Sequence, residues 1–278
     1  MRNTAVLLTV HNRKELTLQC LSCLFSQEVP EDTALQVYLT DDGCTDGTPE
    51  AIVRQFPQVH IISGSGSLFW NRGMNAAWDA ALAEAEYDSF LWLNDDTLLF
   101  PGALTRIFEA DTLKGGQSII VGATVSSSDH SVQTYGGRLE GGKFVTLDGE
   151  LRPARYFNGN IALIPLTVYR RLGQLDPYFS HSFGDFDYGR RAHSAGIAMY
   201  QVGQALGSCD AHVRTSDWCN PALPLATRWR AMYAPNGMPP HEIFHFSRRH
   251  QGFFRACRHY VSTIVHCLCP CLYNWLHK

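Results

Sequence analysis

The sequence has little net charge, no secretory signal and no long apolar run. Its 23 basic and 26 acidic residues leave a formal net charge of −3, so overall charge gives no reason to expect nucleic acid as a partner. The apolar run at residues 5–10 is too short for a secretory signal. The uncharged stretch 260–276 contains His266 and Pro270 and falls short of the about 20 apolar residues that span a membrane. These absences predict a cytoplasmic protein without a spanning helix.

The cysteines lack the pattern of a disulfide framework or a zinc site. There are nine of them, an odd number, in a chain of 278 residues that is large enough to fold without covalent links. Cys20 and Cys23 form a Cys-x-x-Cys pair, but no second pair follows at the spacing of a structural zinc site. We therefore expect reduced thiols, which fits a cytoplasmic location.

Familiar phosphate-binding loops are also missing. Neither Gly-x-Gly-x-x-Gly nor a Walker motif follows the first predicted strand, and residues 9–14 are not a basic glycine-rich loop. This absence counts against a nucleotidyltransferase, which is one alternative for a protein with acidic residues in its first half.

The chain does contain the alternation of short apolar runs and helical patterns that is typical of an α/β fold. Apolar residues make up 45% of the sequence, which is enough for a large core. Helical periodicity covers residues 16–25 and 72–86, and four short apolar runs lie around and between them. These patterns predict a mostly parallel central sheet flanked by helices. The predicted strands are Thr4–Val10, Leu35–Thr40, Val59–Ser63 and Ser89–Leu93.

The second half of the chain is less regular. Glycine pairs interrupt residues 126–156, which indicates a hairpin or an irregular lobe. After it we expect the strands Ile161–Pro165 and Ile197–Val202 and the helices 166–172 and 185–195. We divide the chain into a donor half at 1–125, an acceptor and base half at 126–220, and a helical extension at 221–278.

Acidic residues follow two of the predicted strands. Asp95 and Asp96 follow Ser89–Leu93 after one residue, Asn94, and Asp41 and Asp42 come directly after Leu35–Thr40. Open α/β sheets bind their ligands at the carboxyl ends of the strands. Neighbouring carboxylates repel each other unless a cation lies between them, and their oxygen atoms suit Mg²⁺ or Mn²⁺. The alternative is that each cluster merely caps the helix that follows.

Taken together, these motifs resemble the family 2 glycosyltransferases, which have the Rossmann-like GT-A fold. The family's opening strand is similar to residues 8–13 (LTVHNR), and its Val-Asp-Asp-Gly-Ser-Thr-Asp-Gly-Thr signature is similar to residues 40–48 (TDDGCTDGT). Its metal motif is similar to residues 94–96 (NDD), so the match extends over residues 4–105.

The resemblance implies a role for each matching position in donor binding. Asp42, or Asp41 as the alternative, would accept a hydrogen bond from the nucleobase, and Thr9 and Asn12 would line the nucleotide. Asp95 would lie near the ribose or the metal ion. The segment 63–75, with its glycines and a following helix start, would line the diphosphate. Its Gly66 and Arg72 would contact the donor.

Metal binding and catalysis fall on other positions. Asp96 would bind Mg²⁺ or Mn²⁺, and His212, which follows the last predicted strand, is a candidate second ligand. Residues 182–192 (SFGDFDYGRRA) are similar to the family's Gly-Glu-Asp-x-Asp-x-x-x-Arg-Ala segment, with Gly184 in place of the Glu. Asp185 would then be the general base, while Asp187 would pair with Arg191 at i+4.

The resemblance implies an inverting transfer of a sugar from a nucleotide-sugar donor to a hydroxyl group. The donor would be a UDP-sugar or, alternatively, a dTDP-linked deoxysugar such as rhamnose. The acceptor would be a glycan or a lipid-linked saccharide in surface polysaccharide synthesis. A non-catalytic carbohydrate-binding or nucleotide-binding protein is the second alternative. The basic and apolar end of the chain predicts either peripheral membrane contact or a helix packed on the protein's own core.

Overall fold

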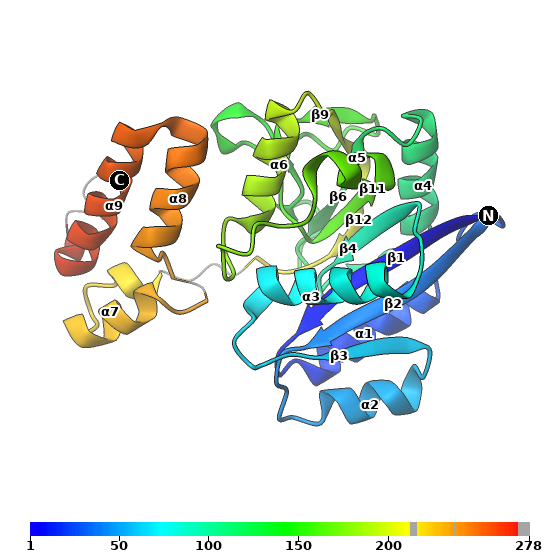
Figure 1. The fold of residues 1–278 in the computed structure, drawn as a ribbon, viewed down its shortest axis with the longest axis horizontal. Helices are drawn as coiled ribbons and strands as arrows, with labels where there is room; N and C mark the ends of the chain where they lie inside the picture. Colours follow the sequence, from blue (N-terminus) through cyan, green and yellow to red (C-terminus); the bar gives the residue numbers. More distant parts are fainter. Residues whose placement is uncertain (212–215, 236, 272–278) are drawn as a thin grey trace.

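Four parallel strands form the first part of the central sheet in the computed structural model, which describes residues 1–211, 216–235 and 237–271 (Figure 1). Their spatial order is β3-β2-β1-β4, and all four confirm predicted strands. Because they run in one direction, their carboxyl ends meet at one edge. The strands are β1 (Arg2–Val10), β2 (Thr33–Asp41), β3 (Val59–Ser63) and β4 (Ser89–Leu93).

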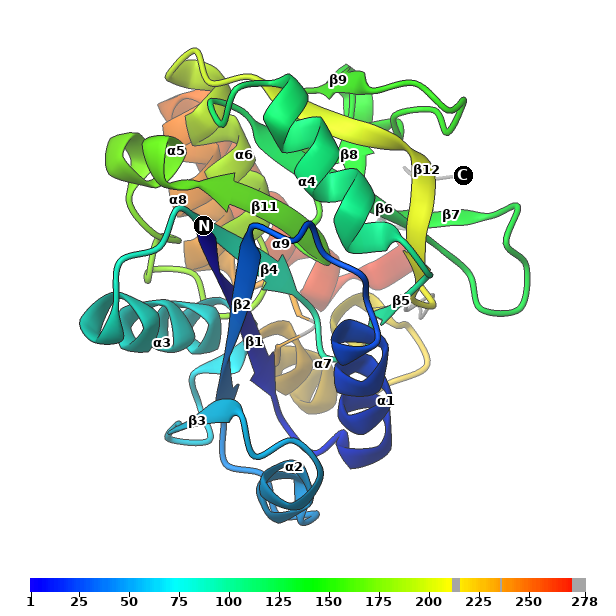
Figure 2. The same ribbon diagram turned by 90° about the vertical axis from the view of Figure 1, so that its right-hand side faces the viewer.

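Helices cover both faces of this sheet because successive strand side chains point in opposite directions. In β1, Ala5 and Leu7 pack with α3 (Phe69–Glu84), whereas Val6 and Leu8 pack with α1 (Lys14–Phe25). Figure 2 shows α3 and α1 on opposite sides of β1. The second face also receives α2 (Thr48–Gln55) and α4 (Ala103–Leu113).

The second part of the sheet is mixed, as predicted. Strand β11 (Ile161–Pro165) is antiparallel to both β4 and β6 (Ile119–Val125), and β12 (Met199–Ser208) is parallel to β6. Two short helices, α5 (Leu166–Leu172) and α6 (Gly184–Ser194), lie on the same face as α3. A two-residue strand, β5 (Leu98–Leu99), follows β4 and pairs with β12. The predicted irregular region carries β7 (Gln133–Tyr135), β8 (Gly137–Arg138), η1 (Glu140–Gly142), β9 (Arg152–Ala154) and β10 (Tyr156–Phe157).

Several elements differ from their predicted bounds by one or two residues at an end, and two of them, β12 and α3, differ most. Strand β12 continues to Ser208, six residues beyond the predicted end at Val202. Its register against β6 shifts between Gln201 and Ala205 and again between Ala205 and Gly207, so the strand passes Gly203 and Gly207 without ending. Helix α3 begins at Phe69, earlier than the predicted residue 72, because the Asp42 carboxylate accepts the Phe69 N–H at 2.8 Å.

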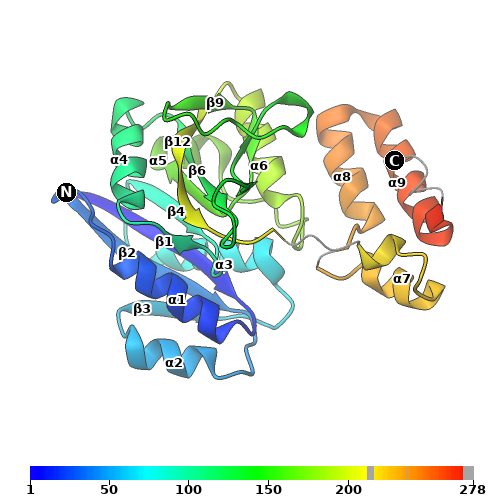
Figure 3. The same ribbon diagram turned by 180° about the vertical axis from the view of Figure 1, so that it is seen from behind.

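The C-terminal extension is helical, as predicted. It contains η2 (Asp217–Cys219), α7 (Leu225–Met232), α8 (Pro240–Gln251) and α9 (Phe253–Leu268). These elements gather beyond α6, at the end of the molecule opposite the N-terminus (Figures 1 and 3). They share a small core of Trp218, Cys219, Met232 and Cys267. Within the described part of the chain, no helix is long and apolar enough to cross a membrane.

Candidate active site

The Asp42 carboxylate is buried and holds the donor segment predicted at residues 63–75. One oxygen accepts the Gly66 N–H and the other accepts the Phe69 N–H, both at 2.8 Å. Glycine is needed at residue 64, because a Cβ there would lie 2.8 Å from Asp42 Oδ1. The acid of the second motif and the glycine-rich segment therefore form one structural unit, although they are more than twenty residues apart.

The other predicted nucleotide contacts surround this unit. Asn12 has a positive φ of 53° and accepts the Thr45 N–H through Oδ1 at 2.7 Å, while Asp41 accepts the Cys44 N–H at 2.8 Å. Both side chains thus shape the turn after β2. The Thr9 side chain faces α3 so closely that a Cβ on residue 73 would come within 2.2 Å of its Oγ1.

Arg72 takes a different direction from the one expected of a diphosphate ligand. Its Nε donates to the carbonyl oxygen of Pro177 at 3.0 Å, so the guanidinium group ties α3 to the loop before α6. A contact with a diphosphate through its remaining nitrogens stays a prediction.

Asp95 and Asp96 share one arginine. Arg13 Nη1 lies 2.6 Å from Asp96 Oδ2 and 3.3 Å from Asp95 Oδ1. Burial raises the pKa of Asp95 to about 7, an effect that Arg13 opposes and that the charge of Asp96 increases. Burial acts to lower the pKa of Arg13, but the charges of Asp95 and Asp96 outweigh this effect and raise the pKa. The pair is therefore a desolvated, acidic position at which additional positive charge is favourable.

The side chains at this position fit a divalent cation that is shared with a substrate. Mg²⁺ is commonly held by one or two carboxylates, with phosphate oxygens and water completing its shell. Among the described residues, no group of three or more His, Cys, Asp or Glu side chains could hold a metal ion. Cys209 donates to Asp96 Oδ1 at 3.5 Å, and burial keeps its thiol protonated by raising its pKa. His212 lies outside the described residues.

Asp185 is the second residue of helix α6, which begins at Gly184, one residue before the predicted start, and two backbone amides hold its carboxylate. Its Oδ2 accepts the Gly159 N–H at 2.9 Å, and its Oδ1 accepts the Phe186 N–H at 2.7 Å. Burial raises the pKa of Asp185 to about 6, although these hydrogen bonds oppose the shift. A carboxylate with a pKa near the operating pH is suited to general base catalysis.

A chain of contacts joins Asp185 to the acids that follow β4. Trp70 Nε1 donates to Asn94 Oδ1 at 2.8 Å, and the Asn94 N–H donates to the Asn160 carbonyl oxygen at 3.0 Å. Gly159 lies between Trp70 and Asp185, because a Cβ there would be 2.8 Å from the indole ring and 3.3 Å from Asp185 Cβ. The structure thus brings the donor segment, the acid pair and the predicted base to one region.

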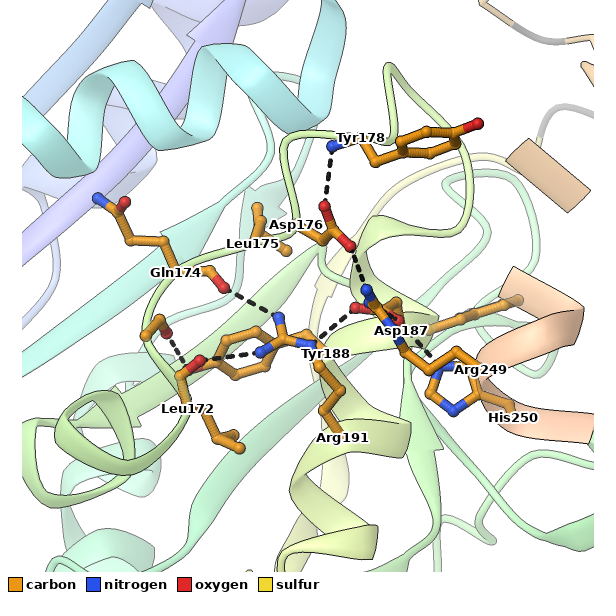
Figure 4. Close-up of polar contacts among 12 residues, drawn as sticks. Leu172, Gln174, Leu175, Asp176, Tyr178, Asp187, Tyr188, Arg191, Arg249 and His250 are labelled. Carbon is orange, nitrogen blue, oxygen red and sulfur yellow. Dashed lines mark hydrogen bonds and ion pairs between the residues drawn. The ribbon is translucent and has the colours of Figure 1, made fainter. Parts of the chain in front are cut away.

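Helix α6, which carries Asp185, is anchored by a cluster of charged side chains that includes residues of helix α8 (Figure 4). Asp187 is fully buried and pairs with Arg191 at 2.8 Å, which is the predicted i+4 pair. It also pairs with Arg249 at 2.7 Å and His250 at 2.8 Å. Burial acts to raise the pKa of Asp187, but the hydrogen bonds from His250, Arg191 and Arg249 and the charge of Arg191 lower it to about 2. Arg249 extends the cluster to Asp176 at 2.6 Å.

Sequence reasoning missed the contribution of the extension to this cluster. Arg249 and His250 were visible as part of a basic group, but their partners are about sixty residues away. Periodicity and spacing describe neighbours along the chain, so they gave no signal for these pairs.

The loop between α5 and α6 connects α3 with α8. On one side, Asn71 Nδ2 donates to the carbonyl oxygens of Asp176 and Phe179 at 2.8 and 3.0 Å. On the other side, the buried Glu242 carboxylate accepts the Ser180 N–H at 3.0 Å and its hydroxyl at 2.7 Å. The loop that leads to Asp185 is therefore fixed both to α3 and to α8 of the C-terminal extension.

Asn71 also explains why glycine replaces the family's glutamate at residue 184. A Cβ on Gly184 would lie 1.8 Å from Asn71 Oδ1, and Asn71 itself is fully buried. Any side chain at residue 184 would have to displace Asn71 from its two hydrogen bonds to the loop.

The fold and the acids at the strand ends define a sugar-transferring enzyme of the GT-A type. The sequence profile of glycosyl transferase family 2 matches residues 5–172, so the chain belongs to glycosyl transferase family 2, as the resemblance predicted.

Similar proteins agree with this assignment. The chain is 24% identical, over 84% of its own length and 81% of the relative's, to an N-acetylglucosaminyl-diphospho-decaprenol L-rhamnosyltransferase found in two strains of Mycobacterium tuberculosis.

Two solved structures share the fold. One is the mannosyltransferase PcManGT from Pyrobaculum calidifontis, in complex with GDP-Man and Mn²⁺, with 18% identity, a TM-score of 0.57, and 95% of this chain and 74% of that chain covered. The other is S. aureus TarS 1–349, with 14% identity, a TM-score of 0.52, and coverage of 92% and 71%. They confirm the predicted GT-A architecture.

Proposed function

We propose that this glycosyltransferase moves a sugar, with inversion, from a nucleotide-sugar donor to a hydroxyl group of a lipid-linked saccharide. The observation that supports it most is the continuous contact path from the Asp95–Asp96 pair through Asn94, Trp70 and Gly159 to Asp185. Residues 1–125 would bind the donor and residues 126–220 the acceptor. In this proposal the partly desolvated Asp185 carboxylate lies beside the donor segment, where the acceptor hydroxyl would approach.

The relative from Mycobacterium tuberculosis suggests which sugar and acceptor to test first. By its name it transfers L-rhamnose to a saccharide carried on a decaprenol diphosphate. We propose rhamnose from a dTDP-linked donor as the first candidate, with UDP-sugars as the alternative, and a polyprenyl-diphosphate saccharide of cell-surface polysaccharide synthesis as the acceptor.

The reaction would be a single displacement. The acceptor oxygen forms a bond to the anomeric carbon as the bond from that carbon to the diphosphate oxygen breaks, and the electron pair leaves with the diphosphate. Asp185 takes the hydroxyl proton, and the amides of Gly159 and Phe186 hold its carboxylate in place. No covalent intermediate on the enzyme is needed, because inversion requires only one base.

Asp96, with Asp95 beside it, would hold Mg²⁺ or Mn²⁺, which supplies neutralisation of the charge that develops on the diphosphate. Arg13 lies against the same carboxylates and balances their charge in the absence of substrate. His212, for which the structure gives no position, stays a candidate further ligand.

A donor screen tests this proposal. Purified protein is incubated with dTDP-rhamnose, UDP-sugars and GDP-mannose, with a polyprenyl-diphosphate N-acetylglucosamine acceptor, in Mn²⁺, Mg²⁺ or chelator. The proposal predicts transfer or slow donor hydrolysis with at least one donor, lost in chelator and in Asp96→Ala. Absence of any turnover or donor binding under all conditions would contradict it.

A further inference from the structure

Helix α9 presents an apolar face to the outside of the molecule. Phe254 is 89% exposed and Val261 57% exposed, and Val265 and Leu268 continue the same side of the helix at helical spacing. We call these four residues the α9 outer face. Surface helices ordinarily turn their apolar side inward, so an outward apolar face of this extent marks an interaction site.

The opposite side of α9 already has partners within the protein. Ala256, Thr263 and Cys267 are buried, and the Cys267 carbonyl oxygen accepts a hydrogen bond from Arg228 of α7 at 2.8 Å. His259 bonds Ser247 of α8 at 2.8 Å. One side of the helix therefore packs against α7 and α8, and the α9 outer face remains exposed.

The charge around the outer face is positive. Arg255 and Arg258 are exposed, and Arg258 follows Phe254 by one helical turn on the same side. Residues 253–271 contain no acidic residue, and the one acid of α8, Glu242, is buried and engaged with Ser180. An apolar stripe with arginines at its border and no acids is complementary to an anionic lipid surface, because arginine stems lie along the acyl boundary while their charges reach the headgroups.

We propose that the α9 outer face docks on an anionic membrane surface and lies in its headgroup region. The inference rests on the proposed function in one respect, which is that a lipid-linked acceptor is presented at a membrane. Helix α8 lies between α9 and the base helix α6 (Figures 1 and 3), and Arg249 and His250 attach it to Asp187. The docking face is thus connected through one rigid helix pair to the helix that carries Asp185.

Vesicle co-sedimentation of the full chain tests the proposal. Wild-type protein is compared with Phe254→Asp/Val261→Asp on vesicles of phosphatidylcholine with phosphatidylglycerol and on vesicles of phosphatidylcholine alone. We expect binding to the anionic vesicles, weakened roughly tenfold or more by the double substitution and by high salt. The matched control is Leu113→Asp, because Leu113 is 73% exposed on α4, away from the extension; it should bind as the wild type does.

The remaining outcomes separate this proposal from others. Thermal unfolding and donor hydrolysis should be unchanged in the double variant, because Phe254 and Val261 are exposed on α9 and lie away from the Asp95–Asp96 pair and from helix α6. Equal vesicle recovery of the wild type and the double variant would overturn the proposal. So would a dimer that the double substitution dissociates, without vesicle binding, since a second copy would then cover the face. Failure of the proposed function gives a different pattern, in which vesicle binding is retained and no sugar is transferred.

Discussion

The proposed donor side and the proposed base side of this enzyme hold their acids in different ways. Asp42, which follows β2, is fixed by backbone amides 24 and 27 residues further along the chain, in the next βα unit. Asp187, two residues after the predicted base, is fixed by Arg249 and His250, 62 and 63 residues away in the C-terminal extension. The proposed donor site is therefore built from segments close in sequence, whereas the helix of the proposed base is held by an element from the C-terminal extension. Substitutions on the two sides should therefore impair the protein in different ways.

The largest expected effect is on catalysis at the base. Asp185→Asn should lower kcat on the order of 10²–10⁴-fold while donor affinity stays unchanged, because the amide keeps the shape of the carboxylate but cannot take a proton. Steady-state kinetics and calorimetric donor titration measure the two quantities. Glu109→Gln, an exposed acid on α4, serves as the control and should have no effect. A matching loss of donor affinity in Asp185→Asn would place this residue on the donor side instead.

The next effect is on stability at the anchor of the base helix. Asp187→Asn removes the negative charge that pairs with Arg191, Arg249 and the buried His250, so unfolding should become easier by roughly 3–5 kcal/mol. Urea unfolding measures this change. In the control Asp148→Asn, the acid of an exposed i,i+4 pair with Arg152 is removed, and we expect no measurable change. If both variants behave alike, the extension does not anchor α6.

A smaller effect should appear where the two sides meet. Gly184→Ala places a methyl group against Asn71 Oδ1 and should destabilise the protein by about 1–3 kcal/mol. A double-mutant cycle with Asn71→Ala isolates the contact, since removing the Asn71 side chain makes room for the methyl group. The two changes should be less harmful together than their sum, and strict additivity would contradict the explanation given for Gly184.

The smallest predicted effect is the pH dependence of the base. The pKa of Asp185 lies at about 6, so the carboxylate is ionised above this pH and protonated below it. At saturating Mn²⁺, kcat/KM should fall about tenfold for each pH unit below the pKa. Asp95, with a pKa of about 7, titrates nearby, which is why the metal concentration is held high. The Asp185→Asn variant should lack this limb of the profile; an unchanged limb would assign it to another group.

The sequence predicted the fold of the first half of the chain well because its signals are local, while the donor-binding roles of its residues stay predictions. Strand periodicity located β1 to β4, and the position of Asp42 and Asp96 after strands followed from the carboxyl-end rule for open α/β sheets. The pairing of Asp187 with Arg191 was also predictable, because helical residues four apart are neighbours.

The base side was predicted in part. Asp185 was proposed through its resemblance to a family segment, but the residues around its carboxylate include Gly159 and, beyond it, Trp70, which no spacing rule places there. The roles of Asp176, Glu242 and Arg249 depend on packing between distant segments, and a single sequence carries no record of such contacts. The same limit applies to Gly184. The sequence shows that this residue departs from the family pattern, but it does not show the cause, which is the buried Asn71 side chain beside it.

Calorimetric titration of the protein with its nucleotide-sugar donor tests the central claim most directly, that Asp96 belongs to the donor site and Asp185 acts on the other substrate. The titrations use wild type, Asp96→Ala and Asp185→Asn, each in Mn²⁺ and in chelator. The account predicts metal-dependent binding of equal strength for wild type and Asp185→Asn, and loss of that binding in Asp96→Ala. Undiminished, metal-independent binding by Asp96→Ala would contradict it.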